Sequence, residues 1–455
     1  MAQSIIYMFN SKIFKAYDIR GLYPEDINEA VAYRIGLAYA EFLRPKTVVV
    51  GCDVRSANES LKKELTRALV ESGVAVIDIG QIATEMLYFA VGHYGYDGGI
   101  VASASHNPAG YGGMKLVMKE SQPIFEKNGL KIIRDRVMSD DLVSPGLAGK
   151  ATSRDILADY FDFIMSFIKA ENLKPLTIVA NPNFGPSGKL LERLVQEKHL
   201  PLTIIPLNFE IDGSFPKGQP DPLLPGNRAE ILALAKEKQT DFGVAWDGDG
   251  DRVFFCDNQG NFYEPCYLTA VMIENLVKKN PGAKVLYDPR YIWAAKAAAK
   301  KSGAVALAER VGHSFIKERM RREDALFCGE SSGHYYFKDN YYCDNGLIPF
   351  LLLWEALSGS GQTLPELLRP YTSKFFVSGE FNTAVISVAE KMAAAEEKYS
   401  DGQIDHLDGV SIEYPDWRFN LRPSNTEPLL RCNIEGKTPE IVAEKKKEIE
   451  ELLSS

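Results

Sequence analysis

The stretch TVVVGCD (residues 47–53) decides the fold, because two variants of it follow along the chain as TIVANP (177–182) and KVLYDP (284–289). Each of these β-branched runs leads into a segment with helix-like composition and then into a second apolar run. A third run ends each copy in a polar loop that contains glycine: DGGIVASASHNP (97–108), DFGVAWDGDGDR (241–252) and ALFCGESSGH (325–334). Near-continuous apolar strands that alternate with helices predict three α/β units with helices on both faces of each sheet.

The expected helices cover residues 57–72, 186–198 and 293–302, and the expected second strands cover 74–79, 202–207 and 304–308. Similar strand–helix–strand patterns occur in any α/β protein, so the repeat alone leaves open whether the three units are related. In open α/β sheets, ligands bind outside the carboxyl ends of the strands. The loop after the third strand of each unit is therefore where we expect chemistry.

The pattern of expected strands and helices changes after residue 370. Residues 375–388 (FFVSGEFNTAVISV) alternate like one antiparallel strand. A helix (389–399), strands (410–414 and 417–421) and a charged helix (439–453) are expected after it. These elements predict a smaller α+β domain behind the three α/β domains. We place the four domains at residues 1–150, 151–254, 255–368 and 369–455.

Composition limits the class of protein. The 455 residues carry 52 Lys and Arg against 61 Asp and Glu, a net charge of -9, which argues against a nucleic-acid binder and for a soluble enzyme. Any anion that it binds must therefore be met by local cationic pockets. Six scattered cysteines with no CxxC pair argue against a disulfide framework or a zinc site. With no signal peptide and no membrane span expected, we predict a cytoplasmic protein that does not associate with membranes.

The loop DGDGDR (247–252) has the composition of a metal site. Three carboxylates at i, i+2 and i+4 of an extended segment point to one side, and the glycines between them let the backbone curl around a small ion. Oxygen-only ligation with open positions suits Mg²⁺. An EF-hand is excluded, because the sixth position is Arg252 and the twelfth is Asn258. A solvated acidic turn is the remaining alternative.

The loop SASHNP (103–108) offers a serine at a strand end followed by histidine, the parts of a nucleophile with a neighbouring base. The nucleophile elbow GxSxG is absent, and a Ser/Asn/Pro turn is by itself more often a plain loop. Lys115, just after a glycine cluster, could bring positive charge to the same place.

Two more polar loops complete the set. GESSGH (329–334) offers donors and acceptors suited to vicinal hydroxyls, and RPSNTEP (422–428), assisted by Arg431, could cradle a phosphate through its guanidinium and turn N–H groups. Either could also be an ordinary turn. One chemically incomplete loop per domain suggests a site that several domains close together.

The motifs KAYDIRG (15–21), SASHNP, DGDGDR, GESSGH and RPSNTEP, in this order over essentially the whole chain, resemble the α-D-phosphohexomutase superfamily. The resemblance is strongest to its phosphomannomutase/phosphoglucomutase branch. It implies three similar α/β domains with mixed sheets, a smaller C-terminal α+β domain and an active site in the central cleft. It also implies reversible conversion of hexose 1-phosphate to hexose 6-phosphate, of mannose and/or glucose, through a phosphoserine and a 1,6-bisphosphate.

The resemblance implies a role for each motif residue. Ser105 matches the phosphorylated serine and a Mg²⁺ ligand, with Asp247, Asp249 and Asp251 as the other ligands. Catalytic groups around them are expected to be His106, Lys115, Arg20 and Arg252. The expected substrate-binding residues are Tyr17, Arg20, Arg290, His313, Glu330, Ser332, His334, Arg422, Ser424, Asn425, Thr426 and Arg431. Glucose or mannose 1,6-bisphosphate is the expected activator, and small-molecule hexose phosphates the partners of a monomer or weak dimer.

Two departures from the family pattern leave these groups intact: Ser103 stands where Thr is common, and Gly112 stands where Asn often precedes Gly. The phosphoglucosamine mutase branch usually has Gly in place of Asn425 and lacks the Gly-His-Ser of residues 312–314. That branch is one alternative function. A metal-dependent sugar phosphatase, and a sugar-phosphate binding protein without turnover, are two others.

Overall fold

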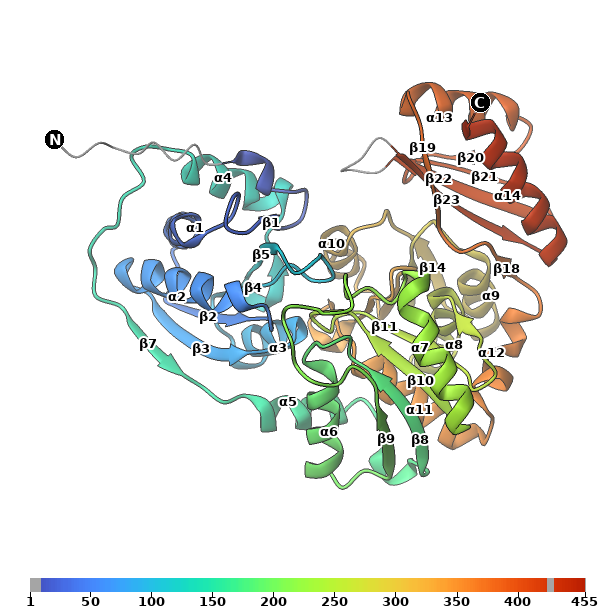
Figure 1. Ribbon diagram of the computed structural model, residues 1–455, viewed down its shortest axis with the longest axis horizontal. Coiled ribbons are helices and arrows are strands. Elements are labelled where there is room, and N and C mark those ends of the chain that lie inside the picture. The colour runs from blue at the N-terminus through green and yellow to red at the C-terminus, as the bar shows by residue number, and fades with distance from the viewer. Residues whose placement is uncertain (1–9, 424–428, 455) are drawn as a thin grey trace. The chain divides into compact units, whose positions relative to one another are not determined.

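The computed structural model describes residues 10–423 and 429–454 (Figure 1). The chain divides into two compact units. Unit 1 consists of Met1–Asn261 and Asp339–Glu355, and unit 2 of Phe262–Lys338 and Ala356–Ser455. No helix in the described part of the chain is both long enough and apolar enough to span a membrane.

The first sheet of unit 1 has the strand order β1-β5-β4-β2-β3-β7, with β6 paired to β5. β2 is parallel to β3 and β4, whereas β5 is antiparallel to β4 and β1, so the sheet is mixed. Its elements are η1 (Ser11–Ile13), β1 (Ile19–Leu22), α1 (Glu29–Leu43), β2 (Thr47–Cys52), α2 (Ser56–Glu71), β3 (Ala75–Gln81), α3 (Thr84–Tyr94), β4 (Gly98–Ala102), β5 (Tyr111–Met118), η2 (Lys119–Ser121), β6 (Gln122–Pro123), η3 (Glu126–Leu130), α4 (Lys131–Val137) and β7 (Lys150–Ser153).

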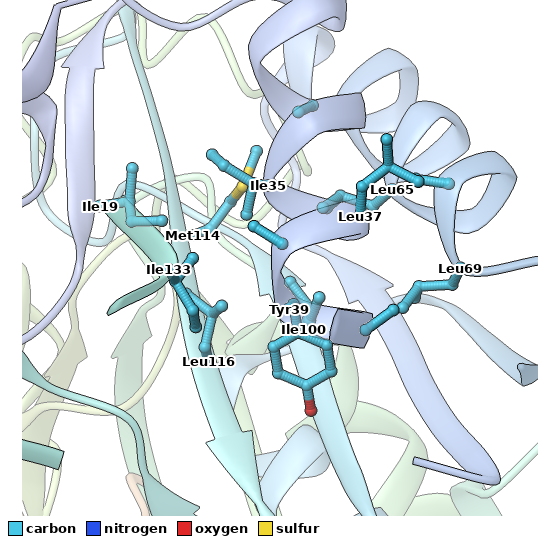
Figure 2. Close-up of a cluster of buried hydrophobic side chains, with 14 of the residues drawn as sticks. Ile19, Ile35, Leu37, Tyr39, Leu65, Leu69, Ile100, Met114, Leu116 and Ile133 are labelled. Carbon is cyan, nitrogen blue, oxygen red and sulfur yellow. The ribbon is translucent and has the colours of Figure 1, made fainter. Parts of the chain in front are cut away.

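Two neighbouring glycines of β4 show that helices cover both faces of this sheet. A Cβ on Gly98 would lie 2.1 Å from the hydroxyl of Tyr39 on α1, and a Cβ on Gly99 would lie 2.8 Å from Val91 on α3. Because successive side chains of a strand point to opposite faces, α1 and α3 lie on opposite sides. On the α1 side, a core forms between the strands and helices α1, α2 and α4, where the labelled side chains of Figure 2 meet.

The second sheet of unit 1 contains the order β11-β10-β8-β9. β8 is parallel to β9 and β10, and β11 returns antiparallel to β10, so this sheet is also mixed. The elements are α5 (Leu157–Met165), η4 (Ala170–Asn172), β8 (Leu176–Asn181), α6 (Ser187–Glu197), β9 (Leu202–Pro206), α7 (Pro225–Lys238), β10 (Phe242–Trp246), β11 (Val253–Cys256), η5 (Lys338–Asn340), β17 (Cys343–Asp344) and α11 (Ile348–Ser360).

Unit 2 contains most of a third mixed sheet, which includes the order β14-β13-β15-β16. β13 is parallel to β14 and β15, and β16 is antiparallel to β15. α9 ends where Gly303 takes the left-handed conformation (φ +78°) that an L side chain rarely adopts. The elements are β12 (Phe262–Tyr263), α8 (Pro265–Lys279), β13 (Lys284–Tyr287), α9 (Trp293–Ser302), β14 (Val305–Ala308), α10 (His313–Glu323), β15 (Phe327–Gly329), β16 (Tyr335–Phe337) and α12 (Leu364–Thr372).

The fourth sheet, also in unit 2, is antiparallel, with the order β18-β23-β22-β21-β20 and with β19 paired to β23. Its core includes side chains of the helices α13 and α14. The elements are β18 (Phe376–Val377), β19 (Phe381–Ala384), α13 (Val388–Lys398), β20 (Gln403–Asp405), β21 (Val410–Glu413), β22 (Trp417–Pro423), β23 (Leu429–Gly436) and α14 (Pro439–Ser454). The expected fold class, three mixed α/β sheets and a smaller α+β domain, is confirmed.

One expected element is wrong. Residues 375–388 do not form a single strand, because Gly379 turns the backbone into the left-handed region (φ +70°) between β18 and β19. The run ends early as well, since the hydroxyl of Ser387 accepts the N–H of Glu390 and starts α13 at Val388. The alternation in the sequence does not show either break.

Candidate active site

Ser105 lies in the loop between β4 and β5, where it is 1% exposed. Its backbone is in the left-handed region (φ +50°), and its N–H donates to the hydroxyl of Ser103 at 3.0 Å. In this conformation the Oγ of Ser105 donates to Oδ2 of Asp247 at 3.2 Å and lies 3.3 Å from Nδ1 of His106. The structure thus brings the serine loop and the acidic loop of unit 1 together.

The acidic loop follows β10, and Asp247, Asp249 and Asp251 are all buried there. One carboxylate oxygen of each lies within 4.8 Å of one from each of the others. The segment is not extended, but its backbone curls at a glycine as expected. Gly250 (φ +83°) closes a turn, in which the N–H groups of Gly250 and Arg252 each donate to Oδ1 of Asp247 at 3.2 Å.

Lys115, on β5, is the cation of the cluster. Its Nζ donates to Oδ2 of Asp249 at 2.7 Å and to Oδ2 of Asp251 at 2.6 Å, and the side chain is buried. The same Oδ2 of Asp249 accepts from the hydroxyls of Thr84 (2.5 Å) and Ser103 (2.9 Å). Three donors, on β5, at the start of α3 and in the loop after β4, therefore hold one oxygen of the loop that follows β10.

The charges of the cluster shift its pKa values in opposite directions. Burial, followed by the charges of Asp249 and Asp251, raises the pKa of Asp247 well above its usual range. Burial and Asp251 also act to raise the pKa of Asp249, but Lys115 and Thr84 hold it below its ordinary value. Although burial alone would lower the pKa of Lys115, Asp249 and Asp251 raise it, so the lysine is charged.

The donor set fits a magnesium ion. The three aspartates supply only carboxylate oxygens, the ligands that Mg²⁺ prefers. Oδ1 of Asp249 is buried without a hydrogen-bond partner among residues 10–423 and 429–454, an arrangement that costs free energy unless a cation takes that place. The acidic cluster is therefore a candidate metal site.

Three further expected residues of unit 1 lie around this cluster. The guanidinium of Arg20 donates to Oδ2 of Asp18 at 2.7 Å and to Oδ1 of Asn107, in the serine loop, at 2.5 Å. Nε of Arg252 lies 3.8 Å from Oδ2 of Asp247. Tyr17 is half-buried in the bend before β1.

Sequence reasoning missed several residues that position the site. Thr84 and the side chain of Ser103 bind Asp249, and Arg55 binds three carbonyls of the serine loop. The two charged residues Asp53 and Arg55, directly after β2, were a usable signal, because they stand at the same edge of the sheet as the serine loop. Thr84 gave no signal, since a threonine that begins a helix is ordinary capping chemistry.

In unit 2, the loop GESSGH joins β15 to β16 and buries Glu330. The Oε2 of Glu330 lies 3.0 Å from Nδ1 of His334 and accepts the hydroxyl of Tyr336 at 2.9 Å, while Oγ of Ser332 lies 2.9 Å from the same His334 nitrogen. Burial acts to raise the pKa of Glu330, but His334 and the nearby Arg290 hold it well below its usual range. The loop is thus a connected polar network with an ionised carboxylate at its centre.

Arg290 extends this network. Its Nη2 donates to Oδ2 of Asp288 at 3.0 Å and to Oε1 of Glu330 at 3.3 Å. His313 is the first residue of α10, with Nδ1 3.4 Å from the hydroxyl of Ser314.

Arg422 and Arg431 face each other across β22 and β23. Oε2 of Glu380 accepts from Arg422 at 2.8 Å and Oε1 accepts from Arg431 at 3.1 Å. Burial acts to raise the pKa of Glu380, but Arg290, Arg422 and Arg431 lower it. Glu380 therefore links Arg422 of β22 to Arg431 of β23. The expected residues Ser424, Asn425 and Thr426 lie outside the described residues.

The chain matches four family models described as phosphoglucomutase/phosphomannomutase: alpha/beta/alpha domain I at residues 11–142, domain II at 158–260, domain III at 264–375 and the C-terminal domain at 384–452.

Similar proteins align over nearly the whole chain. A phosphomannomutase of Escherichia coli is 43% identical over 432 residues, 93% of this chain and 95% of that protein. One of Salmonella montevideo is 42% identical over 98% of this chain and 100% of its own. A crystal structure of a phosphoglucomutase/phosphomannomutase family protein from Burkholderia thailandensis has a TM-score of 0.88 at 30% identity and covers 98% of both chains. The chain therefore belongs to the phosphoglucomutase/phosphomannomutase family of hexose-phosphate mutases.

Proposed function

We propose that the chain interconverts hexose 1-phosphates and hexose 6-phosphates, of mannose and/or glucose, through a phosphorylated Ser105 and a hexose 1,6-bisphosphate intermediate. The observation that carries this proposal is the position of the Ser105 hydroxyl, 3.2 Å from Asp247 in a buried cluster of three aspartates. The 42–43% identity to phosphomannomutases supports mannose as a substrate.

Each half-reaction exchanges one bond for another. The bond between phosphorus and Oγ of Ser105 breaks, and a bond to the free hydroxyl of the sugar phosphate forms. The proton of that hydroxyl passes to a base, and the released Oγ of Ser105 takes up a proton. The bisphosphate then turns over and returns its other phosphoryl group to Ser105. His106, whose Nδ1 lies 3.3 Å from Oγ of Ser105, and Lys115 are the proton-handling groups that we propose.

Phosphate monoesters are very slow to hydrolyse in water, so the site must stabilise the charge on the transferred phosphoryl oxygens. Asp247, Asp249, Asp251 and the phosphorylated Ser105 would hold Mg²⁺, which when bound supplies positive charge at these oxygens. Lys115 fixes two of the carboxylates, and Arg252 adds a guanidinium beside the third. Preorganised charge of this kind is usually the largest contribution to such a rate enhancement.

Substrate binding is proposed for groups in both units. Tyr17 and Arg20 would face the substrate near Ser105. Glu330, Ser332 and His334 offer donors and acceptors for sugar hydroxyls, with Arg290 and His313 as further contacts. Arg422, Ser424, Asn425, Thr426 and Arg431 would hold the phosphate that is not being transferred. Since the intermediate binds in two orientations, this phosphate site must accept both.

Glucose or mannose 1,6-bisphosphate is the proposed activator, because it can phosphorylate Ser105 and start the cycle. We also propose a monomer or weak dimer that works in the cytoplasm. Six free cysteines, all buried, support a reducing compartment.

The test is a coupled assay of mannose, glucose, glucosamine and N-acetylglucosamine 1-phosphates with a catalytic amount of 1,6-bisphosphate. We expect the highest kcat/KM with mannose or glucose 1-phosphate, and no turnover in Ser105→Ala. A preference for glucosamine 1-phosphate would assign the chain to the phosphoglucosamine mutases instead. Release of inorganic phosphate at the rate of sugar consumption would indicate a phosphatase, and most of the rate remaining in Ser105→Ala would overturn the proposed nucleophile.

A further inference from the structure

The backbone of Ser105 has an unfavourable conformation. Left-handed backbone is rare for residues other than glycine, and it persists only where the surroundings hold it. Ser105 takes it (φ +50°) in a position that is 1% exposed, and its hydroxyl reaches Asp247 from there. Some group must therefore fix the peptide that follows Ser105.

Arg55 makes the contacts that can do so. Its Nη2 donates to the carbonyl oxygens of Ser105 at 2.7 Å and Asn107 at 2.5 Å, and its Nη1 donates to that of Pro108 at 2.6 Å. One planar guanidinium thus binds three carbonyls of a single loop, and it is 2% exposed. Only arginine has rigid, coplanar donors for such a set.

Arg55 is itself held in place from several sides. Its Nε lies 3.4 Å from Oδ2 of Asp53, while Oδ1 of Asp53 accepts the N–H of Arg55 at 2.9 Å and the side-chain amide of Asn58 at 2.5 Å. The ring of Phe215 lies 4.8 Å from the guanidinium carbon.

The acidic loop also packs closely against the carbonyl group of Ser105. A Cβ on Gly248, between Asp247 and Asp249, would lie 3.0 Å from the carbonyl oxygen of Ser105. The segment that carries Phe215 approaches as closely, since a Cβ on Gly213 would lie 2.6 Å from the Cα of Arg55. The carbonyl of Ser105 is therefore enclosed between Arg55 and the acidic loop.

We propose that Arg55 is a positioning residue: by binding the carbonyls of Ser105, Asn107 and Pro108, it holds Ser105 in the left-handed conformation that directs its hydroxyl at the acidic cluster. This inference rests on the proposed function for its effect on turnover, and on the geometry alone for its effect on the loop. It predicts that Arg55 acts on the phosphoryl-transfer steps without touching the sugar.

The decisive variant is Arg55→Lys, which keeps the charge and most of the volume but cannot bind three carbonyls at once. We expect kcat, and the rate at which glucose 1,6-bisphosphate phosphorylates Ser105 (followed by intact mass), to fall roughly 100-fold, the usual cost of a misplaced reacting group. KM for the hexose phosphate should change less than about threefold, because the proposed sugar contacts lie on other elements.

The matched control is Arg34→Lys. Arg34, on α1, also donates from its guanidinium to backbone carbonyls, those of Val137 (2.9 Å) and Ser139, but these are remote in sequence from the serine loop. Its kcat should stay within about twofold of the unaltered protein, and Arg55→Lys losing no more than Arg34→Lys would overturn the proposal.

A crystal structure of Arg55→Lys separates this inference from the proposed function. We expect Ser105 to leave the left-handed region and its Oγ to move away from Asp247; Ser105 remaining near φ +50° would overturn the inference whatever the activity. Absence of mutase turnover in the unaltered protein would instead refute the proposed function.

If Arg55→Lys does not fold, Asp53→Asn, which removes the ion partner of Arg55, should lower kcat roughly tenfold at constant KM. An unchanged kcat would then be the refuting result.

Discussion

At the scale of single residues, Lys115 explains how three buried aspartates can lie together. Its ammonium donates to Asp249 and Asp251, and its positive charge offsets the repulsion between them inside unit 1. Removing one partner of a buried ion pair leaves an uncompensated charge, which usually costs about 3–5 kcal/mol.

Lys115→Met tests this role. We expect this substitution to lower the free energy of unfolding by about 3–5 kcal/mol in metal-free buffer. Added Mg²⁺ should stabilise the variant more than the unaltered protein, because the ion then replaces the missing cation. Urea unfolding with and without Mg²⁺ measures both effects. Lys62→Met is the control, because Lys62 is also buried but pairs with Glu59 and Asp78 away from the cluster. Equal stabilisation of the unaltered protein and Lys115→Met by Mg²⁺ would contradict this account.

A second prediction concerns Glu330 and pH. The pKa of Glu330 is held below its ordinary value in the folded state, so this residue stabilises the protein above the unfolded value of about 4.3 and loses that effect as the pH falls towards the folded pKa. The stability difference between the unaltered protein and Glu330→Gln should shrink between pH 6 and pH 3, by up to about 1.4 kcal/mol per pH unit below the unfolded value. Urea unfolding at a series of pH values measures it, and a constant difference would argue against an ionised Glu330.

The motif residues could be predicted from the sequence because five motifs follow one another in a specific order, although each motif is a weak signal by itself. The residues that hold them could not. Arg55 is separated by fifty positions from the Ser105 carbonyl that it binds, and Thr84 by 165 from Asp249. Only the strand order of the folded sheets brings such pairs together, and a single sequence does not specify that order.

At the scale of elements, the serine loop depends on close packing between β1, β4 and β5. Gly113 of β5 has no room for a side chain, since a Cβ there would lie 2.5 Å from the carbonyl oxygen of Ser103 and 2.7 Å from that of Ile19. Both neighbours are backbone atoms, so neither can yield as a side-chain tip would. The approach of β5 to the serine loop thus requires glycine.

Gly113→Ala should therefore displace the serine loop. We expect a loss of about 1–3 kcal/mol in the free energy of unfolding, as in other overpacked sites, together with a lower kcat. Gly110→Ala is the matched control, because a Cβ at Gly110 meets no atom within 4 Å, and it should stay within about 0.5 kcal/mol of the unaltered protein. Urea unfolding and the coupled assay report on the two effects, and equal behaviour of the two variants would refute the steric argument.

The repeated strands and helices that were expected in the three α/β units lie within a few residues of those in the structure, because buried parallel strands are continuous apolar runs between helices. The strands of the fourth sheet were harder to predict from the sequence. Its strand β23 was not predicted, since polar side chains such as Asn433 and Glu435 are buried beside the apolar ones and hide the alternation. Burial of Glu435 is possible because Arg418 and two backbone N–H groups bind it, partners that only the fold supplies.

At the scale of the whole molecule, we expect the fold to be independent of the metal site. Each of the four sheets has its own backbone hydrogen bonds, and the acidic loop is tied by Lys115, Thr84 and Ser103. Chelation should therefore remove the activity and leave the fold.

We expect a chelator to lower turnover by roughly 100-fold or more, with recovery when Mg²⁺ is added back, because the main source of positive charge at the phosphoryl group is lost. Far-UV circular dichroism should not change. Parallel measurements of both signals over a chelator titration test this, and loss of the helical signal together with activity would show that the ion is structural.

The six buried thiols have a practical consequence for measurement. Sulfhydryl-directed dyes have no accessible native target in the folded chain, so a cysteine introduced at the surface becomes a unique attachment point without removal of any natural one. Gly110→Cys in unit 1 and Ile386→Cys in unit 2, at an exposed loop and a fully exposed side chain, would carry a donor and an acceptor fluorophore. Energy transfer between them then reports, in real time, whether the spacing of the two units changes when a sugar phosphate binds.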